Sequence, residues 1–430
     1  MNVLYVCHQF FPDHYTGTER YTLALARQMQ RMGHHVTVST YESKLSPEAR
    51  PVDSPGVLMR RYVTEGVRVL AWRLVDHEDA GFGGVSSRVG DPAMESALRE
   101  HLRAERPDVV HVTHSMRQTP IVRVTEELGI PLVMHLTDFW LLCPRGTLLD
   151  ANGGLCEGPE GGARCTEHCF EPHFGPALRR RTAAARAMLN VPDVIVAPSR
   201  FLADVFLRHG ADAGRMVHRT YAFDLSVLAG IARTPRTEAL RLAFLGTVLP
   251  HKGVEVLVRA VTSIADAPLT LDIHGGSLDQ HAHLATLKRL AKGDPRIRIR
   301  GEYRYEDIGA ILAEVDVAVC PSLWYENNPL AVGIAQAAGI PCVVTDLGGM
   351  TELVRDGVDG CSFPRGSVDR LAAVLHRLAA DPEEVARLAR AVRPPPFIEA
   401  DVHELARMYA RLVRGEPIPV HPSARILPRA

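Results

Sequence analysis

The chain has 430 residues and a formal net charge of −1, with 49 Lys and Arg residues against 50 Asp and Glu residues. This length favours two domains, each able to bury a sizeable core. The balanced charge lacks the basic footprint of a nucleic-acid-binding protein. No apolar run is long enough to span a bilayer. The first residues, "MNVLYVCHQFFP", have the pattern of a buried strand and not of a signal peptide, so we expect a cytoplasmic protein.

In the first half, apolar runs of strand length alternate with amphipathic segments. Strands are predicted at "VLYVC", "HVTVST", "VRVLAWRL", "DVVHVTH", "PLVMHLT" and "DVIVAPS". Helices are predicted over 19–32, 94–104 and 119–128. This alternation is typical of a parallel sheet with helices on both faces. The pattern lapses over 225–240, which predicts a linker between domains.

The second half repeats the alternation. Strands are predicted at "LRLAFLG", "LTLDIHG", "RIRIRG", "VDVAVCP", "IPCVVT" and "GCSFP", and three consecutive prolines precede a last helix. We therefore expect an α/β fold with two tandem Rossmann-like, doubly wound domains, at 1–228 and 240–395, followed by a terminal helix over 396–415. Ligands of such sheets bind at the carboxyl ends of the strands, which predicts a binding cleft between the domains.

The stretch "YENNPLAV", residues 325–332, predicts a phosphate-binding helix start. Pro329 suits the first helical position, and Asn327 or Asn328 can cap it. The unpaired N–H groups and the positive end of the helix dipole would attract a phosphate. Glu326 lies just ahead, where its carboxylate can accept hydrogen bonds from sugar hydroxyls or merely complement the helix dipole.

A second stretch, "FLGTVLPHKGVEVL", supplies a positive charge. A strand ends at Gly246 and a loop leads to Lys252, which can neutralise a diphosphate as a point charge. The stretch is not a P-loop, since the final Gly-Lys-Ser/Thr arrangement is absent. Alone, Lys252 is typical of a surface residue. Together with Glu326 and the glycine turn "DLGGMTELV", which contains Gly348, Gly349 and Glu352, it forms a set.

Three stretches, 8–38, 242–260 and 314–364, resemble retaining glycosyltransferases of family 4, which have the GT-B fold. The resemblance covers almost the whole chain. It implies that a hexose-type sugar moves from a nucleotide-diphosphate donor on the second domain to an acceptor on the first, with retained anomeric configuration and without a catalytic metal. The acceptor would be a glycan, a lipid-linked or a small molecule. The resemblance also implies bacterial polysaccharide biosynthesis and a last helix that crosses back onto the first domain.

The resemblance assigns roles to individual residues. Glu326 would contact the donor hexose, while Lys252 and the backbone of 327–330 would hold the diphosphate. Gly17 in "TGTE" would allow its loop to approach the donor closely, as glycine permits. The expected catalytic residues are Glu326, Lys252, His135 and His114. The expected donor-binding residues are Gly17, Thr18, Thr247, His251, Asn327, Asn328, Pro329, Leu330, Ile334 and Gly349.

The main departure from the family pattern is Ile334, which stands where a second glutamate is expected, eight residues after Glu326. That acid would accept hydrogen bonds from both ribose hydroxyls. A hydrogen bond to a charged group contributes roughly 1.5–3 kcal/mol. Its loss would weaken nucleotide binding about tenfold to a few hundredfold. Gln336, two positions on, points to another side of the helix.

Other departures affect the phosphate and sugar contacts. Thr247 stands where many relatives have a bidentate arginine, and Thr16 replaces the first glycine of the usual pair. Thr137 stands where an "HDFW"-like motif has its histidine. His135, on the same face of a strand, or His114 in "HVTHSM" could take over that role, although a structural or polar role fits either residue as well.

Two interpretations therefore remain open. The favoured one is an active transferase with an altered nucleotide preference, because Glu326, Lys252 and the "NNPL" helix start are retained. The alternative is a non-catalytic GT-B protein that binds a ligand or partner. An NAD-dependent oxidoreductase is rejected, since "GFGGVSS" at 81–87 follows no strand-to-helix fingerprint.

Four of the eight cysteines, Cys143, Cys156, Cys165 and Cys169, lie within 27 residues. The segment between them is rich in glycine and acids, and a tetrahedral zinc would pin it. The spacing lacks paired C-x-x-C knuckles, so disulfides and free thiols are alternatives. His168 or His173 could replace one thiol. The other four cysteines lie in apolar strand-like runs typical of reduced core thiols.

Two further segments concern the acceptor. The run "ALRRRTAAARAML", residues 177–189, predicts a basic helix. Such a helix can touch anionic lipid headgroups at the inner face of a membrane, although a solvated surface explains it equally well. The loop at 77–92 is expected to close over the acceptor.

Overall fold

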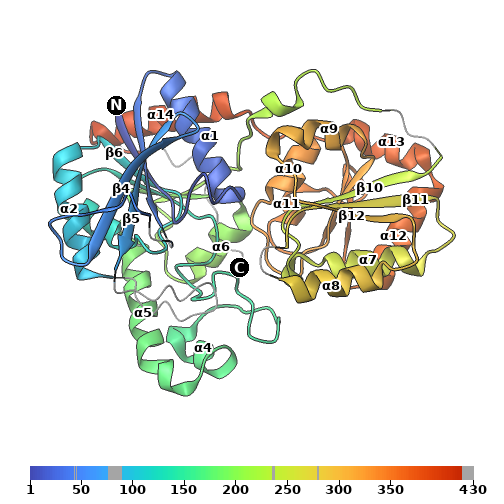
Figure 1. Ribbon diagram of the computed structural model, residues 1–430, viewed down its shortest axis with the longest axis horizontal. Coiled ribbons are helices and arrows are strands. Elements are labelled where there is room, and N and C mark those ends of the chain that lie inside the picture. Colours follow the sequence, from blue (N-terminus) through green and yellow to red (C-terminus); the bar gives the residue numbers. More distant parts are fainter. Residues whose placement is uncertain (43, 45, 76–89, 235–237, 278–279, 419–430) are drawn as a thin grey trace. The chain divides into compact units, whose positions relative to one another are not determined.

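The computed structural model of the chain describes residues 1–42, 44, 46–75, 90–234, 238–277 and 280–418 (Figure 1). The loop predicted at 77–92 falls mostly outside these residues, as does "GFGGVSS" at 81–87, so both predictions stay open. The chain forms two compact units. The first comprises Met1–Ala222 and Ile398–Ala430, and the second comprises Phe223–Phe397.

The segment expected as a linker belongs for the most part to the second unit. A 3₁₀ turn at Leu225–Leu228 opens it, and Arg233 donates to the carbonyl of Val315 at 2.7 Å. The backbone of Phe223 pairs with Phe397 at the other end of the same unit. The segment has neither helix nor strand periodicity in its sequence. Its contacts with residues distant in the chain hold it within the second unit.

The first unit contains a nine-stranded sheet in the order β3-β4-β5-β2-β1-β6-β7-β8-β9. The strands are β1 (Asn2–Val6), β2 (His35–Tyr41), β3 (Arg50–Pro51), β4 (Val57–Thr64), β5 (Val67–Leu74), β6 (Val109–Val112), β7 (Leu132–His135), β8 (Val194–Ala197) and β9 (Met216–His218). Six of them match the predicted runs. The strands from β5 to β9 pair in parallel, as expected.

The expectation of an entirely parallel first sheet is wrong at one edge, where β4 pairs antiparallel with β5 along its full length. The two strands are joined by Glu65 and Gly66, both with positive φ, as a two-residue hairpin turn requires. The sequence of β4, "VLMRRYVT", hid the strand because Arg60 and Arg61 interrupt its apolar pattern.

Seven α-helices are described in the first unit. They are α1 (Gly17–Arg31), α2 (Pro92–Glu105), α3 (Pro120–Glu127), α4 (Ala163–His168), α5 (Gly175–Met188), α6 (Arg200–Arg208) and α14 (Ile398–Val413). The last helix packs against α1 (Figure 1). It is anchored by Tyr409, whose buried hydroxyl hydrogen-bonds His111 of β6.

The second unit is an entirely parallel six-stranded sheet in the order β12-β11-β10-β13-β14-β15. Its strands are β10 (Leu240–Leu245), β11 (Leu269–His274), β12 (Ile297–Gly301), β13 (Val317–Cys320), β14 (Cys342–Thr345) and β15 (Gly360–Phe363), and all six were predicted. This is the doubly wound Rossmann order, which reverses direction between β10 and β13. Ligands of such sheets bind at this switch point.

Helices cover both faces of the second sheet, with α7, α8 and α12 on one face and α9, α10 and α11 on the other (Figure 1). The helices are α7 (Val254–Ser263), α8 (His281–Leu290), α9 (Ile308–Ala313), α10 (Leu330–Ala337), α11 (Met350–Leu353), α12 (Val368–Ala380) and α13 (Pro382–Ala391). Because both faces are covered, the central strands β10, β13 and β14 are nearly continuous apolar runs, whereas β11 and β12 at one edge alternate between apolar and polar residues. Among the described helices of the whole chain, none has the length and apolar character needed to cross a membrane.

Candidate functional site

Two loops at the switch point of the second sheet bring the predicted Lys252 and Glu326 together. One loop follows β10 and ends in the 3₁₀ turn Pro250–Lys252, and the other follows β13. Since β10 and β13 are parallel neighbours, their carboxyl ends open at the same edge. Lys252 Nζ donates to Glu326 Oε1 at 2.7 Å. Lys252 therefore contacts Glu326 directly, the residue with which sequence analysis had grouped it.

Glu326 is a buried, ionised carboxylate. Its Oε1 also accepts hydrogen bonds from Ser322 Oγ and Trp324 Nε1, both at 2.8 Å. Burial alone would raise the pKa of Glu326. The charge of Lys252 and these hydrogen bonds outweigh that effect, so the pKa is lowered. All three hydrogen bonds go to Oε1, which leaves Oε2 to accept from a ligand hydroxyl.

Glycine turns hold this arrangement in place. Gly253, with φ +70°, turns the chain from Lys252 into α7. The predicted turn at Gly348 and Gly349 lies against Glu326: the Gly349 N–H donates to the Glu326 carbonyl at 2.7 Å. A Cβ at Gly348 would lie 2.8 Å from that carbonyl, and φ there is +63°. The turn thus fixes the backbone from which the Glu326 side chain projects.

The helix that follows Glu326 begins one residue later than predicted. Pro329 occupies the N-cap, the position expected for an asparagine, and α10 starts at Leu330. The backbone of Pro329, with ψ 122°, is extended and cannot be the first helical residue. Asn327 and Asn328 are buried in the loop ahead. An α-helix leaves its first N–H groups without an intrahelical acceptor, so the start of α10, four residues after Glu326, can still bind an anion.

Ile334 lies in the interior on α10, with 2% of its surface exposed. Its side chain offers no hydrogen-bond acceptor. Gln336 cannot replace the missing acid, because its amide donates to the Leu353 carbonyl at 2.7 Å. This contact agrees with the prediction that Gln336 points elsewhere.

An aromatic contact that sequence reasoning missed completes this side of the site. The Trp324 ring lies 4.8 Å from Lys252 Nζ, in a cation–π contact, and 5.0 Å from the His251 ring. Burial, and then the charge of Lys252, lower the pKa of His251 to about 4, so this imidazole is neutral at neutral pH. Thr247 is partly buried in the loop after β10. The signal for Trp324 was its place two residues ahead of Glu326.

In the first unit, the predicted His114 forms a pair with Asp138, at 2.9 Å between Nε2 and Oδ2. The backbone N–H of Met116 donates to His114 Nδ1 at 3.2 Å. Nδ1 must therefore be unprotonated, and the imidazole proton lies on Nε2, directed at the carboxylate. Asp138 is also fixed, since the Trp140 N–H donates to its Oδ1 at 2.7 Å. Only the "DFW" motif pointed to this aspartate.

A second buried cluster lies beside His114. The His8 and His114 rings are 4.0 Å apart, and His8 Nε2 is 3.7 Å from Glu19 Oε1. Thr16 donates to the other oxygen of Glu19 at 2.7 Å, ahead of α1. Gly17, which is exposed, and Thr18, which is partly buried, open α1, where sequence analysis placed the approach to the donor. Sequence analysis did not select His8 or Glu19, although "HQFFP" and "TGTE" contain them.

The other predicted histidine, His135, lies elsewhere. It is buried at the end of β7, stacked on His111 at 5.7 Å and on Tyr221 at 5.4 Å. Neither ring nitrogen has a hydrogen-bond partner, and burial holds its pKa well below the usual value. These surroundings favour a structural role for His135 over a catalytic one.

The four clustered cysteines line one small cavity of the first unit. All eight cysteines of the chain are free thiols. No three of the four clustered sulfur atoms lie within 4.8 Å of one another; among the described residues, Cys7, His8 and Glu19 are the set of ligand atoms that does. The side chains of His168 and His173 are 45% and 64% exposed, beside Glu167 and Glu171 respectively. They are not members of the cavity lining.

Comparison with known families assigns both units to the same class. The model "Glycosyl transferase 4-like domain" matches residues 16–222, and the model "Glycosyl transferases group 1" matches residues 239–381. The chain therefore belongs to the glycosyltransferases, and its two Rossmann-like units form the GT-B fold of this superfamily.

Individual relatives extend this result over nearly the full length. The chain is 26% identical to a glycogen synthase of Mycobacterium tuberculosis over 97% of both sequences. It is 28% identical to a D-inositol 3-phosphate glycosyltransferase of Kribbella flavida over 45% of this chain and 51% of that one. Similar solved structures include a sucrose-phosphate synthase from Thermosynechococcus elongatus (TM-score 0.69, 16% identity) and Anabaena HepE in complex with UDP and glucose (TM-score 0.65, 16% identity). Both cover 96% of this chain and 99% of the other.

Proposed function

We propose that this glycosyltransferase moves a hexose from a nucleoside diphosphate sugar to a hydroxyl of a glycan, lipid-linked or small-molecule acceptor, with retention of anomeric configuration. The donor binds the second unit beside Lys252 and Glu326, and the acceptor binds the first unit. The observation that carries this proposal is the Lys252–Glu326 pair at the switch point of the sheet. Support also comes from Anabaena HepE, a protein of the same fold crystallised with UDP and glucose.

The geometry suits the departure of a diphosphate. In the reaction, the bond between the anomeric carbon and the phosphate oxygen breaks, and the nucleoside diphosphate leaves with the electron pair. The acceptor oxygen forms the new bond and loses its proton. Lys252 uses one of its three N–H donors on Glu326, which leaves two for the phosphate oxygens. The first turn of α10 adds backbone donors and a positive dipole, so both features stabilise the charge that develops on the leaving group.

Glu326 has two functions in this proposal. Its Oε1 orients Lys252 and neutralises that charge when no donor is bound. Its Oε2 accepts a hydrogen bond from a donor hexose hydroxyl, which places the anomeric carbon. Since the pKa of Glu326 is lowered, the carboxylate is ionised throughout the physiological pH range.

Ile334 argues for weak nucleotide binding and not for loss of function. It removes the expected ribose contact, while Lys252, the first turn of α10 and Glu326, which we propose contact the phosphates and the hexose, are all retained. The non-catalytic alternative requires that these remaining contacts bind no donor.

The test is a panel of UDP-, GDP-, ADP- and dTDP-sugars, with thermal shift and slow donor hydrolysis as readouts. Ligand that binds only the folded protein raises its melting temperature. We expect a shift and hydrolysis with one nucleotide family, both of them lost in Lys252→Ala and kept in Lys288→Ala, which removes an exposed lysine of the same unit. Absence of any shift or hydrolysis across the panel would favour the non-catalytic alternative.

A further inference from the structure

We propose that Cys143, Cys156, Cys165 and Cys169 bind a structural zinc ion as a tetrathiolate centre that fixes the loop after β7. The inference is independent of the proposed function, because it rests on a part of the first unit that is remote in sequence from Lys252 and Glu326. For brevity these four residues and the cavity that they line are called the cysteine cavity.

The first observation is that three different local structures direct the four thiols into one cavity. Cys143 lies in a tight turn, in which its N–H donates to the Phe139 carbonyl at 2.7 Å. Cys156 follows Leu155, which pairs with Leu149 in an isolated antiparallel β-bridge, and the Cys156 N–H donates to the Leu148 carbonyl at 2.8 Å. Cys165 lies on α4, and Cys169 follows it one turn later, with its N–H on the Cys165 carbonyl at 3.0 Å. Four thiols from separate backbone structures that line one cavity form a ligand set of the kind that zinc binds.

The second observation is that the segment has almost no apolar core of its own. Of residues 151–170, four are buried: Gly158, Pro159, Gly162 and Cys165. Two of these are glycines, which contribute no side chain. Burial of this kind stabilises little, and a structural metal supplies folding free energy where a core cannot.

The third observation is a buried cation that has no carboxylate hydrogen-bonded to it. Arg181 of α5 is 0% exposed, and its one hydrogen bond goes to the Trp140 carbonyl. Its Nε and Nη1 atoms have no partner. Its guanidinium lies over the Trp140 ring, 4.5 Å from the centroid, and Cys143, Cys165 and Asp138 lie near enough to act on its charge. A buried charge that has no anion hydrogen-bonded to it is unfavourable, so a further anion beside Arg181 would stabilise this site.

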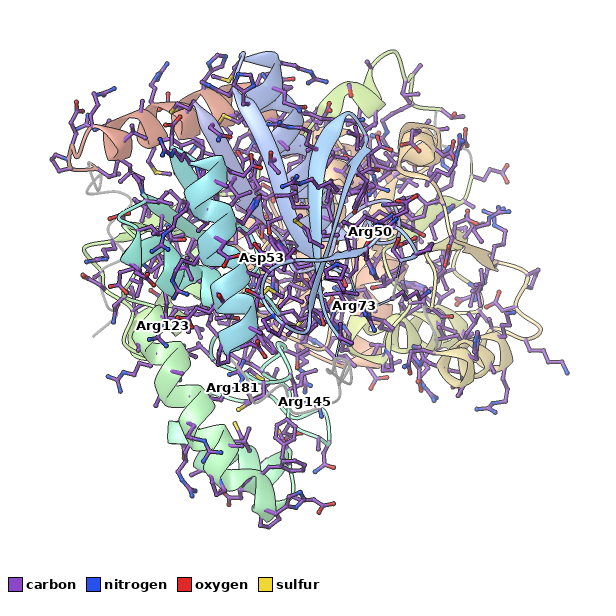
Figure 2. The ribbon with its side chains drawn as sticks, turned by 60° about the vertical axis from the view of Figure 1, so that its left-hand side comes forward. Arg50, Asp53, Arg73, Arg123, Arg145 and Arg181 are labelled. Atoms are coloured by element: carbon purple, nitrogen blue, oxygen red, sulfur yellow. The ribbon has the colours of Figure 1, made fainter. Side chains whose placement is uncertain are left out.

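A zinc tetrathiolate is such an anion, since four thiolates around a divalent ion leave a net charge of about −2. Arg145 is a second cation, and it lines the cysteine cavity. Its Nε is buried without a hydrogen-bond partner, and its charge acts on Cys169. Figure 2 shows Arg181 on α5 and Arg145 on the loop that runs beside it. Asp138 and Asp150 act on Arg181 and Arg145 respectively, but no hydrogen bond joins either arginine to its carboxylate among the described contacts. A metal-bound thiolate set would add the negative charge that neutral thiols do not supply.

Zinc binding requires the four sulfurs to draw closer. Zinc–sulfur bonds of about 2.3 Å place tetrahedral sulfurs less than about 4 Å apart, and the present spacing is wider. Without an ion at the centre, no attraction draws the four thiols together. A divalent ion displaces the protons, attracts all four sulfurs, and acts on a glycine-rich loop that can move to meet it.

The inference also explains what the loop does for its surroundings. Trp140 connects the cysteine cavity to the His114–Asp138 pair: its carbonyl accepts from Arg181, and its N–H donates to Asp138. Cys143 follows three residues later. A metal at Cys143 would therefore hold Asp138 in position without touching it.

The experiment is metal analysis of the full chain, purified without chelator, by inductively coupled plasma mass spectrometry. We expect about one zinc per chain, retained in Cys7→Ser and reduced at least tenfold in Cys165→Ser. Cys7→Ser is the matched control, since it removes a buried cysteine of the same unit that belongs to the competing set Cys7, His8 and Glu19. Cys156→Ser, at a less buried position, serves if Cys165→Ser does not fold.

The outcomes separate the alternatives. Zinc loss in Cys7→Ser with retention in Cys165→Ser would place the metal elsewhere and overturn the proposal. A metal-free wild-type protein would also overturn it, whether the four residues then react as free thiols or are found by mass as two disulfides. Iron in place of zinc would overturn the identity of the ion. Cobalt(II) that replaces the zinc with the visible absorption of a tetrahedral thiolate complex would support the geometry.

Discussion

Gly253 lies so close to the carbonyl of Pro321 that a Cβ at Gly253 would stand 1.9 Å from that oxygen. The contact joins the two loops of the switch point, because Gly253 follows Lys252 and Pro321 opens the loop that carries Glu326. The close approach brings the two charged residues within hydrogen-bond distance.

This relationship predicts a large effect of Gly253→Ala. The added methyl group clashes with backbone and also strains a left-handed conformation, so we expect a loss of more than about 3 kcal/mol in the free energy of unfolding. Gly293→Ala is the control: its φ is +90°, and its Cβ would meet nothing within 4 Å. Gly293→Ala should lower the free energy of unfolding only by the backbone strain of a left-handed conformation, about 1–2 kcal/mol. Urea denaturation measures both, and equal losses would contradict the proposed contact.

A second prediction concerns Glu326. Replacing it by alanine removes the acceptor of three hydrogen bonds and leaves Lys252 without its anion. We expect kcat/KM for sugar transfer to fall at least about a hundredfold, or about 2.7 kcal/mol. Glu255→Ala, which breaks an exposed pair with Arg259 on α7, should keep the wild-type rate. Unchanged product formation in Glu326→Ala would show that this carboxylate has no part in the reaction.

Ile334→Glu tests the altered nucleotide site. A carboxylate at this position should regain the ribose hydrogen bonds and tighten nucleotide binding by about tenfold to a few hundredfold. The same variant should melt at a lower temperature without ligand, because it places a charge at a position that is 2% exposed. Isothermal titration with nucleoside diphosphates measures the affinity, and Ile334→Leu is the apolar control. If Ile334→Glu binds no tighter, Ile334 does not face the ribose.

The pH dependence of stability should reveal His111. Burial, with a smaller contribution from Arg219, lowers its pKa from 6.5 to about 3. The unfolded chain therefore binds one proton more than the folded chain between these values, so stability falls as the pH falls from 6.5 towards 3. His111→Asn should reduce the slope of the free energy of unfolding against pH by up to the amount that corresponds to one proton. Tyr409→Phe loses the same hydrogen bond but keeps the titrating ring, so its slope should match the wild type. Equal slopes for His111→Asn and the wild type, from urea unfolding at several pH values, would contradict the assignment.

Arg181→Met distinguishes a zinc-bound cysteine cavity from a metal-free one. With zinc present, loss of the compensating cation should increase the rate of zinc release to a chelator by about tenfold. Without metal, removal of an unpaired buried charge should be neutral or stabilising. Arg180→Met, at the exposed neighbouring position, is the control and should release zinc as the wild type does. A colorimetric zinc indicator measures the release.

The basic run 177–189 shows what a local sequence pattern can predict and what it cannot. It predicted a helix, and α5 spans Gly175–Met188. The run does not distinguish Arg181 from Arg179 and Arg180, because three consecutive arginines look alike. In the structure, Arg179 and Arg180 are exposed while Arg181 is buried against Trp140. A helix turns about 100° per residue, so neighbours on one helix meet different surroundings.

The sequence alone predicted the six strands of the second unit and the two loops that carry its candidate site. Buried parallel strands are continuous apolar runs, and Lys252 and Glu326 follow two of them at loops rich in glycine and proline. It did not show β4, whose polar face hides the strand pattern, or the exact start of α10. Tertiary structure alone decided that Lys252 hydrogen-bonds Glu326, that His114 meets Asp138 while His135 does not, and that Arg181 is buried against Trp140. These relationships join residues far apart in the chain, and no local periodicity encodes them, because distance in space is set by how the strands are ordered in the sheet.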